Sequence, residues 1–426
     1  MTLLNEDFLA RLDRALSAKE RRFDRLLEMA GLDPACDLRF ADLRGVQFGG
    51  SLLDRWDFTG ADLQGASFRG AQISNCIFTD ARGANLTGSI NLGSKQLPDQ
   101  DILLAKEIVL IGPLKPVVVK GLEAVCTVHK AAAAENRDAF IADHSNVGAI
   151  ACSATTELIP GSFMARFPKL QIVSSFGVGY DHIDVKWAAA HGVVVTNTPE
   201  VLTEEVADTA LGLLLCTVRE FPQAERFLRA GKWLKQGYPL SKATLRNRTV
   251  GMVGMGAIGQ AIARRLEAFG VPVVYHTRQP RRELAYRHYP NLVDMARAVD
   301  ILLVIVPGGP STQNMINAEV LDALGPDGIL INMARGSVVD EPALIKALKE
   351  KRIMAAGLDV YVNEPEVPKE LIETENVVLF PHLGSASVYT RDKMDQLIVD
   401  NISAWAAGKP PLTPVPETPW RSWNKS

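Results

Sequence analysis

The chain of 426 residues has room for two or three domains of roughly 150 residues each. It carries 46 Lys and Arg against 49 Asp and Glu, so a net charge of −3 offers no global basic field to a nucleic acid or an anionic membrane surface. A hydrophobic share of 47% and a charged share of 22% are ordinary for globular proteins and exclude wholesale disorder.

The cysteines and the N-terminus indicate a cytoplasmic protein. Five cysteines are an odd number and include no C-x-x-C pair, so we expect neither a disulfide framework nor a metal site. Charges interrupt the first twenty residues, which therefore lack the apolar core of a secretory signal. The longest apolar runs, such as 210–216 and 301–306, are far shorter than the ~20 residues that span a bilayer, so we expect no membrane partner.

Residues 5–30, within an N-terminal segment 1–35, are predicted to form one amphipathic helix. Apolar residues recur at helical spacing from Phe8 to Met29, and Gly31 with Pro34 follows as a stop signal. Lys and Arg fill the opposite face, so we expect a helix that packs on or caps a neighbouring core.

A five-residue period runs through 36–90. Large apolar residues stand five apart at Leu38, Leu43, Phe48, Leu53, Phe58, Leu63, Phe68, Ile73 and Phe78. Gly45, Gly50, Gly60, Gly65 and Gly70 stand two positions after such residues, which suits a coil that turns every five residues with glycine at tight corners. ADLRG (41–45), ADLQG (61–65), ASFRG (66–70) and ANLTG (84–88) resemble the pentapeptide-repeat family, which implies a short right-handed β-helix. A step of eight from Phe78 to Leu86 predicts one distorted corner.

After a linker expected at 91–106, short apolar runs alternate with helical stretches. The expected strands lie within 107–112, 147–152, 170–177, 192–197, 249–254, 271–276, 301–306 and 329–334. This alternation is typical of parallel sheets and predicts an α/β fold. The proline-rich segment 409–426 is predicted to be an extended tail.

The segment 249–270 contains a dinucleotide-binding pattern. A buried strand leads into G-x-G-x-x-G at Gly254, Gly256 and Gly259, and a helix follows. The first glycine permits a tight turn, the second lets a pyrophosphate approach the backbone, and the third allows close helix packing. The helix N-terminus at Ala257 and Ile258 then faces the phosphates.

The strand after this helix favours NADP over NAD as the cofactor. An NAD enzyme would hold the ribose 2′-hydroxyl with an acidic residue at this strand end. Here the strand ends in His276, Thr277 and Arg278, with Arg281 close behind. A guanidinium pairs with a 2′-phosphate in a forked, charge-assisted geometry, so NADPH is the expected cofactor.

Four blocks within 107–408 resemble the D-isomer-specific 2-hydroxyacid dehydrogenase family, and most closely its NADP-preferring glyoxylate/hydroxypyruvate reductases. They are SSFGVGYDHID (174–184), the glycine pattern, INMARGSVVDEPAL (331–344), and GLDVYVNEPEVP (357–368) followed by LFPHLGSAS (379–387). The resemblance implies two doubly wound, Rossmann-like domains: a substrate domain at 107–205 and 383–408, and a nucleotide domain at 206–382. It also implies a homodimer formed along a long helix at 204–231.

The resemblance places the catalytic roles on Arg335, Glu364 and His382. A guanidinium supplies two donors to a substrate carboxylate and carbonyl, and a histidine can deliver a proton near neutral pH. A carboxylate beside that imidazole favours its protonated form. The resemblance further implies substrate contacts from the amides of Val178 and Gly179, and cofactor contacts from Asp359, on the nicotinamide side, and from Gly384.

We therefore expect a reductase of small 2-oxo acids, with two alternatives. A nucleotide-sensing co-repressor-like protein would share the fold, and intact Arg335, Glu364 and His382 do not exclude it. The pentapeptide segment could instead be the functional part, as a binding module for an unknown protein partner. Its arginines offset its aspartates, which disfavours a DNA-mimicking role.

Overall fold

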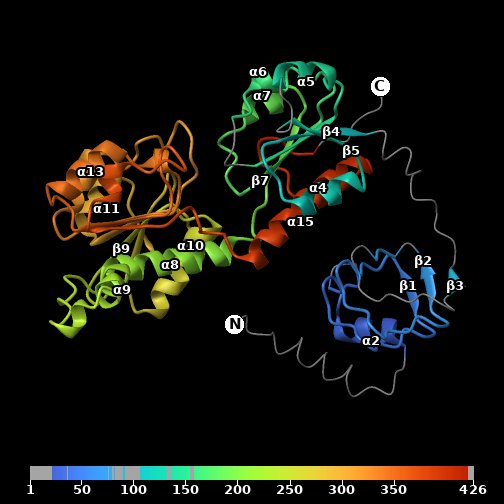
Figure 1. Ribbon diagram of the computed structural model, residues 1–426, viewed down its shortest axis with the longest axis horizontal. Coiled ribbons are helices and arrows are strands. Elements are labelled where there is room, and N and C mark those ends of the chain that lie inside the picture. Colours follow the sequence, from blue (N-terminus) through green and yellow to red (C-terminus); the bar gives the residue numbers. More distant parts are fainter. Residues whose placement is uncertain are drawn as a thin grey trace. The chain divides into compact units, whose positions relative to one another are not determined.

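The computed structural model describes residues 22–35, 37–74, 76–78, 81, 90–91, 106–131, 136–153 and 158–420. The chain divides into two compact units, Met1–Ile102 and Leu103–Ser426 (Figure 1). Within these described ranges, every helix is too short or too polar to cross a membrane.

The first unit is a coil whose turns stack as a parallel ladder. Its strands are β1 (Leu52–Asp54), β2 (Gln72–Ser74) and β3 (Ile90–Asn91), hydrogen-bonded in that order. Leu52 pairs with Gln72, and isolated bridges join Asp42 to Asp62 and Gln47 to Ser67. Each pair is 20 residues apart, so one turn has four sides of five residues.

Phenylalanines fill the interior of the coil. Phe48, Phe58 and Phe68 have no exposed surface. Phe48 stacks on Phe68 with ring centroids 4.4 Å apart, and Phe58 stacks on Phe78 at 5.0 Å, so residues one turn apart lie directly above each other. The corner glycines predicted from the sequence all have positive φ, from 68° to 78°. The five-residue period therefore produces the coil for the expected reason.

The helix before the coil packs against its first turns. Helix α2 (Phe23–Ala30) buries Leu27, and Phe23 meets Phe48 with centroids 4.9 Å apart. The rest of the helix predicted at 5–30 lies outside the described residues, as does most of the linker predicted at 91–106. Most of the distorted corner predicted between Phe78 and Leu86 also lies outside them. Gln72, before this corner, pairs with Ile90, after it, and these two residues are 18 positions apart instead of 20. The difference of two residues equals the difference between the step of eight and the regular step of ten.

The second unit contains two parallel sheets. The five-stranded sheet of the first lobe, in the order β5-β4-β6-β7-β8, comprises β4 (Glu107–Ile111), β5 (Thr127–Lys130), β6 (Ala149–Ser153), β7 (Ile172–Phe176) and β8 (Val194–Thr196). The seven-stranded sheet of the second lobe, in the order β11-β10-β9-β12-β13-β14-β15, comprises β9 (Val250–Val253), β10 (Val273–His276), β11 (Arg287–His288), β12 (Ile301–Val304), β13 (Ile329–Asn332), β14 (Ala355–Leu358) and β15 (Val377–Leu379).

Helices cover both sheets. They are α4 (Pro116–Glu123), α5 (Arg137–Asp143), α6 (Gly161–Met164), α7 (Val185–Ala190), α8 (Thr203–Arg219), α9 (Phe221–Arg229), the 3-10 turn η2 (Lys232–Leu234), α10 (Ala257–Ala268), α11 (Leu292–Ala298), α12 (Ala318–Leu324), the 3-10 turn η3 (Gly336–Val338), α13 (Glu341–Lys349), α14 (Lys369–Ile372) and α15 (Val388–Ala406). Helix α8 leads from the first lobe into the second. Helix α15 returns to the first lobe, where it packs beside α4 (Figure 1). The predicted α/β class with two Rossmann-like lobes is confirmed.

In the described part of the second unit, all eight expected strand segments contain a strand, and four further strands, β5, β11, β14 and β15, were not expected. Among these, β14 has the sequence AAGL and lacks large apolar residues. The reason is close packing against α8, because a Cβ on Gly357 would overlap Thr217 Oγ1. Strand β5 is half-exposed at a sheet edge, and β11 and β15 are only two and three residues long.

The single helix expected at 204–231 is wrong, because the structure divides it. Helix α8 ends at Arg219, Glu220 adopts a left-handed φ of 56°, and α9 begins at Phe221. Pro222 explains the break, since proline lacks an N–H and clashes with the preceding turn in a helix interior but fits a first turn.

The described part of the predicted tail, 409–420, lies against the first lobe. Pro414 forms an antiparallel bridge with Thr196 of β8, and Val415 is only 1% exposed within the core of that lobe. Bends at 412–413 and a turn at 416–417 interrupt the predicted extended form, and these residues belong to the packed structure of the first lobe.

Candidate active site

The candidate residues of the second lobe gather at one edge of its sheet. Gly254 follows β9, His276 ends β10, Arg335 follows β13, Asp359 follows β14, and His382 follows β15. Since these strands are all parallel, their carboxyl ends meet at one edge. Ligands of open α/β sheets bind at that edge.

The glycine turn after β9 leaves space for a ligand at one position only. Gly254 has a φ of 102°, and a Cβ there would overlap the carbonyl of Ile305. A Cβ on Gly259 would overlap the carbonyl of Gly254, so both glycines are required by packing. At Gly256, by contrast, a Cβ would meet no atom within 4 Å. This open position at the start of α10 suits the pyrophosphate of a dinucleotide.

The N-terminus of α10 is also suited to hold phosphate. Gly256 is its N-cap and has no side chain that could accept a hydrogen bond from the first turn. The amides of Ala257 and Ile258 lie in this first turn, where helix N–H groups lack partners within the helix. The residues present therefore fit a bound dinucleotide.

The end of β10 brings one of the predicted arginines to this turn. Arg281 donates through Nη1 to the carbonyl of Met255 at 2.9 Å, within the glycine turn. Its Nε also donates to Glu283 at 2.8 Å. Arg278 is exposed at the end of β10. His276 instead faces inward, because its Nδ1 lies 2.9 Å from the carbonyl of Tyr289.

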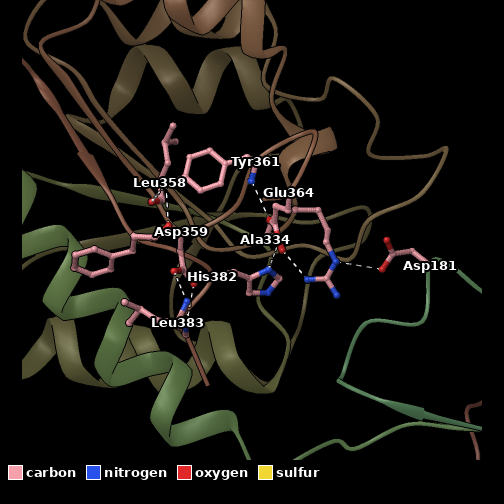
Figure 2. A network of polar contacts seen from close by, with 11 residues as sticks. Asp181, Ala334, Leu358, Asp359, Tyr361, Glu364, His382 and Leu383 are labelled. Atoms are coloured by element: carbon pink, nitrogen blue, oxygen red, sulfur yellow. Dashed lines mark hydrogen bonds and ion pairs between the residues drawn. The ribbon is translucent and has the colours of Figure 1, made fainter. Parts of the chain in front are cut away.

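Asp359 holds the turn that carries His382. Its carboxylate accepts the backbone N–H of Leu383 at 2.7 Å and that of Gly384 at 2.9 Å, and its carbonyl accepts the N–H of His382 at 2.9 Å (Figure 2). Burial raises the pKa of Asp359, and the bond from the Leu383 amide partly offsets this rise. Asp359 thus orients the histidine turn, a role that its sequence assignment to cofactor contact did not include.

His382 and Glu364 form a close pair. His382 Nδ1 lies 2.6 Å from Glu364 Oε2, while Glu364 Oε1 accepts the N–H of Tyr361 at 3.0 Å (Figure 2). Burial alone would raise the pKa of Glu364, but the hydrogen bond and charge of His382 lower it below its ordinary value. Glu364 is therefore positioned to stabilise a positive charge on His382, and Nε2 remains as the ring atom for proton exchange.

Arg335 connects the two lobes at this edge. It donates through Nη1 to the carbonyl of Ala334 at 2.8 Å, and its Nε pairs with Asp181 of the first lobe at 3.3 Å. A Cβ on Gly179 would overlap Arg335 Nη2, so the guanidinium lies directly against the backbone of the loop 177–181. The charge of Arg335 also lowers the pKa of Glu364.

The structure thus brings together Arg335, Glu364, His382 and Gly179, the last from the other lobe. Val178, beside Gly179, has its carbonyl bound by Asn197 Nδ2 at 2.8 Å. The glycine turn and Arg281 form a second group. Sequence reasoning missed Asp181 and Tyr361, although Asp181 stands two positions after Gly179 and could have been considered with it.

Comparison with known proteins identifies relatives for both units. A family model for the NAD-binding domain of D-isomer specific 2-hydroxyacid dehydrogenases matches 211–384, and pentapeptide repeats match 41–80 and 57–90. Glyoxylate/hydroxypyruvate reductase A of Arabidopsis thaliana is 47% identical over 269 residues, 63% of this chain and 84% of the relative. Hydroxyphenylpyruvate reductase of Plectranthus scutellarioides is 46% identical over 275 residues, 65% of this chain and 84% of the relative.

A solved structure agrees with these matches. It is an NADPH-dependent glyoxylate/hydroxypyruvate reductase from Sinorhizobium meliloti in complex with NADP and malonate. Its sequence is 53% identical, and the match has a TM-score of 0.70 and covers 74% of this chain and 98% of that chain. The N-terminal resemblance to pentapeptide repeats is confirmed by the family match.

His182 anchors the loop that ends at Asp181. Its ring is buried, with Nε2 3.3 Å from Ser175 Oγ and 3.8 Å from Cys152 Sγ. Its carbonyl accepts the N–H of Ile159 at 2.7 Å. Burial lowers the pKa of His182 to about 4, so the ring is neutral near pH 7.

This burial predicts a loss of stability in mild acid. The unfolded chain takes up a proton near the ordinary pKa of 6.5, whereas the folded chain does so only near 4, so the unfolded state binds more protons between these values. The free energy of unfolding should fall by about 3 kcal/mol through His182 as the pH drops through this window. Urea titrations of the protein and of His182→Gln should reveal a shallower pH dependence in the variant. A change at the exposed His191, as His191→Gln, should leave that slope intact, and an unaltered slope in His182→Gln would contradict the assignment.

Proposed function

The chain belongs to the D-isomer-specific 2-hydroxyacid dehydrogenase family, and we propose that within this family it is an NADPH-dependent reductase of small 2-oxo acids, glyoxylate and hydroxypyruvate first among them. The observation that carries the proposal is the group formed by Arg335 and the His382–Glu364 pair at the sheet edge that also holds the glycine turn. The relatives named glyoxylate/hydroxypyruvate reductases support the choice of substrate.

The glycine turn and α10 hold the dinucleotide. When bound, the reduced nicotinamide supplies the hydride that reduces the substrate carbonyl. Gly256 lets the pyrophosphate approach the backbone, and the amides of Ala257 and Ile258 donate to it. Arg278 and Arg281, at the end of β10, would contact the 2′-phosphate and so favour NADPH over NADH.

Arg335 binds and polarises the substrate. Its guanidinium carries a permanent charge and lies against Gly179, whose amide with that of Val178 would donate to the substrate carboxylate. A negative charge grows on the carbonyl oxygen as it is reduced, and a fixed cation beside that oxygen stabilises the transition state. Asp181 limits the freedom of the guanidinium before substrate arrives.

His382 donates the proton that completes the alcohol. Its Nδ1 is occupied by Glu364, which leaves Nε2 to donate to the forming alkoxide. Glu364 stabilises the protonated ring before transfer, and it holds the ring orientation through its second bond to the Tyr361 amide. In the reverse direction the same nitrogen would accept the proton from a 2-hydroxy acid.

The cofactor proposal predicts a preference that depends on Arg278. The kcat/KM with NADPH should exceed that with NADH by at least about tenfold, because a charge-assisted pair with the 2′-phosphate is formed only by NADPH. Arg278→Ala should lower the kcat/KM with NADPH and leave the kcat/KM with NADH unchanged, as measured by steady-state kinetics with each cofactor. Arg297→Ala removes another exposed arginine, on α11, and serves as the control for net charge. Equal use of both cofactors by the unmodified protein would refute the preference.

The catalytic proposal predicts that His382→Asn loses turnover but keeps cofactor binding. Asparagine tolerates the φ of 52° at this position, so the turn should survive. Removal of a general acid should lower kcat by a factor on the order of 100 to 10,000. NADPH fluorescence titration should give an unchanged Kd, and exposed His191→Asn is the control. Near-normal turnover in His382→Asn would assign the proton to another group.

We also propose that the chain forms a homodimer through the segment 221–240, which begins with α9. Apolar side chains of this segment lie outside the buried core: Leu234 is 92%, Leu240 is 94% and Trp233 is 65% exposed. Clustered exposed apolar residues are typical of protein contacts. Sedimentation velocity should therefore give twice the chain mass of 46.4 kDa, and Leu234→Asp should halve it. A monomeric unmodified protein would refute this assembly.

A further inference from the structure

The segment 413–418, which we call the C-terminal brace, is fixed along β8. The N–H of Val415 donates to the carbonyl of Val195 at 2.9 Å, and Thr418 Oγ1 accepts the N–H of Val195 at 2.8 Å. Val415 is buried in the core of the first lobe. These bonds hold the brace to the sheet, and they leave Thr413 and Glu417 to make other contacts.

Thr413 supports the first side of the loop 177–181 through Asn197. Its hydroxyl donates to the carbonyl of Asn197 at 2.6 Å, and Asn401 of α15 binds both the hydroxyl and the N–H of Thr413, at 2.9 and 3.0 Å. Asn197 in turn donates through Nδ2 to the carbonyl of Val178 at 2.8 Å. A chain of hydrogen bonds therefore runs from α15 through the brace to the residue before Gly179.

Glu417 supports the other side of the same loop. The hydroxyl of Tyr180 donates to its carboxylate, at 3.1 Å to Oε2 and 3.4 Å to Oε1. Burial, and then the charge of Glu417, raise the pKa of Tyr180 to about 12, so the hydroxyl keeps its proton at neutral pH. The bond joins residues 237 positions apart in the chain.

The two contacts lie on either side of Gly179, whose backbone faces Arg335. A loop without regular hydrogen bonding is normally more mobile than the strands beside it. Here Val178 and Tyr180 are each held from the brace, so the peptide groups between them have little freedom to move.

We propose that the C-terminal brace is a positioning element for substrate binding: Thr413 and Glu417 fix the Val178 and Gly179 amides in the orientation that receives the carboxylate of a 2-oxo acid. This inference rests on the proposed function. None of the brace residues touches the reacting atoms, so they act through the loop. Their loss should weaken substrate binding and leave the hydride and proton steps nearly intact.

The test is a set of variants at the Tyr180–Glu417 bond. Glu417→Ala and Tyr180→Phe should each raise the KM for glyoxylate about fivefold, with kcat and the KM for NADPH within about twofold of the unmodified protein. The double variant should resemble either single one, because both remove the same bond. Glu417→Gln keeps an oxygen that can accept from Tyr180 and should restore most of the affinity.

A matched control separates positioning from loss of stability. Val118 is fully buried in α4, in the same lobe, so Val118→Ala should lower the Tm without changing the KM for glyoxylate. If Val118→Ala raised this KM as much as Glu417→Ala did, or if Glu417→Ala left it unchanged, the brace would have no positioning role.

Amide hydrogen exchange gives a readout that does not depend on turnover. Exchange in the peptide that covers 177–181 should be faster in Glu417→Ala and Tyr180→Phe than in the unmodified protein, and unchanged in Val118→Ala. Unaltered exchange in both Glu417→Ala and Tyr180→Phe would overturn the positioning role of the brace. Failure of the unmodified protein to reduce any 2-oxo acid with NADPH would instead overturn the proposed function, and the exchange result would still decide whether the loop is held.

Discussion

The candidate site depends on the hydrogen bonds that Asp359 makes to one turn of backbone. His382 has a φ of 52°, in a region that side chains other than glycine adopt reluctantly. Asp359 binds the backbone N–H groups of His382, Leu383 and Gly384, and so keeps the turn in this conformation. The 2.6 Å contact to Glu364 is possible only because the imidazole is held in this place. Asp359, at the end of its strand, therefore orients the backbone from which the imidazole of His382 extends.

The two lobes contribute different kinds of group to the site. The second lobe supplies charged side chains that follow its strands, whereas the first supplies the loop 177–181, with its backbone at Gly179 and the carboxylate of Asp181. Arg335 of the second lobe contacts this loop of the first lobe, because it lies against Gly179 and pairs with Asp181. A neutral His182, buried behind Asp181, holds that loop without placing a second positive charge near Arg335.

Local signals in the sequence predicted much of this arrangement. The glycine pattern predicted a strand, a turn and a helix, and the structure gives Gly254 and Gly259 a steric reason and leaves open space at Gly256. The five-residue period specified the coil in the same way. Strand β14 was missed because contact with α8 restricts it to small residues, which carry no strong strand signal. The contacts of Asp359 and Glu417 were missed because both depend on backbone that is distant or irregular, and residue spacing does not encode such contacts. The break at Glu220 could have been found, since Pro222 marks it.

The brace follows every candidate catalytic residue in the sequence, and this order has a consequence for synthesis. A ribosome completes the glycine turn, Arg335 and the histidine turn before it reaches Thr413, so a nascent polypeptide contains every candidate catalytic group while the loop 177–181 still lacks both supports. A stop codon introduced after Pro411 would release such a chain permanently.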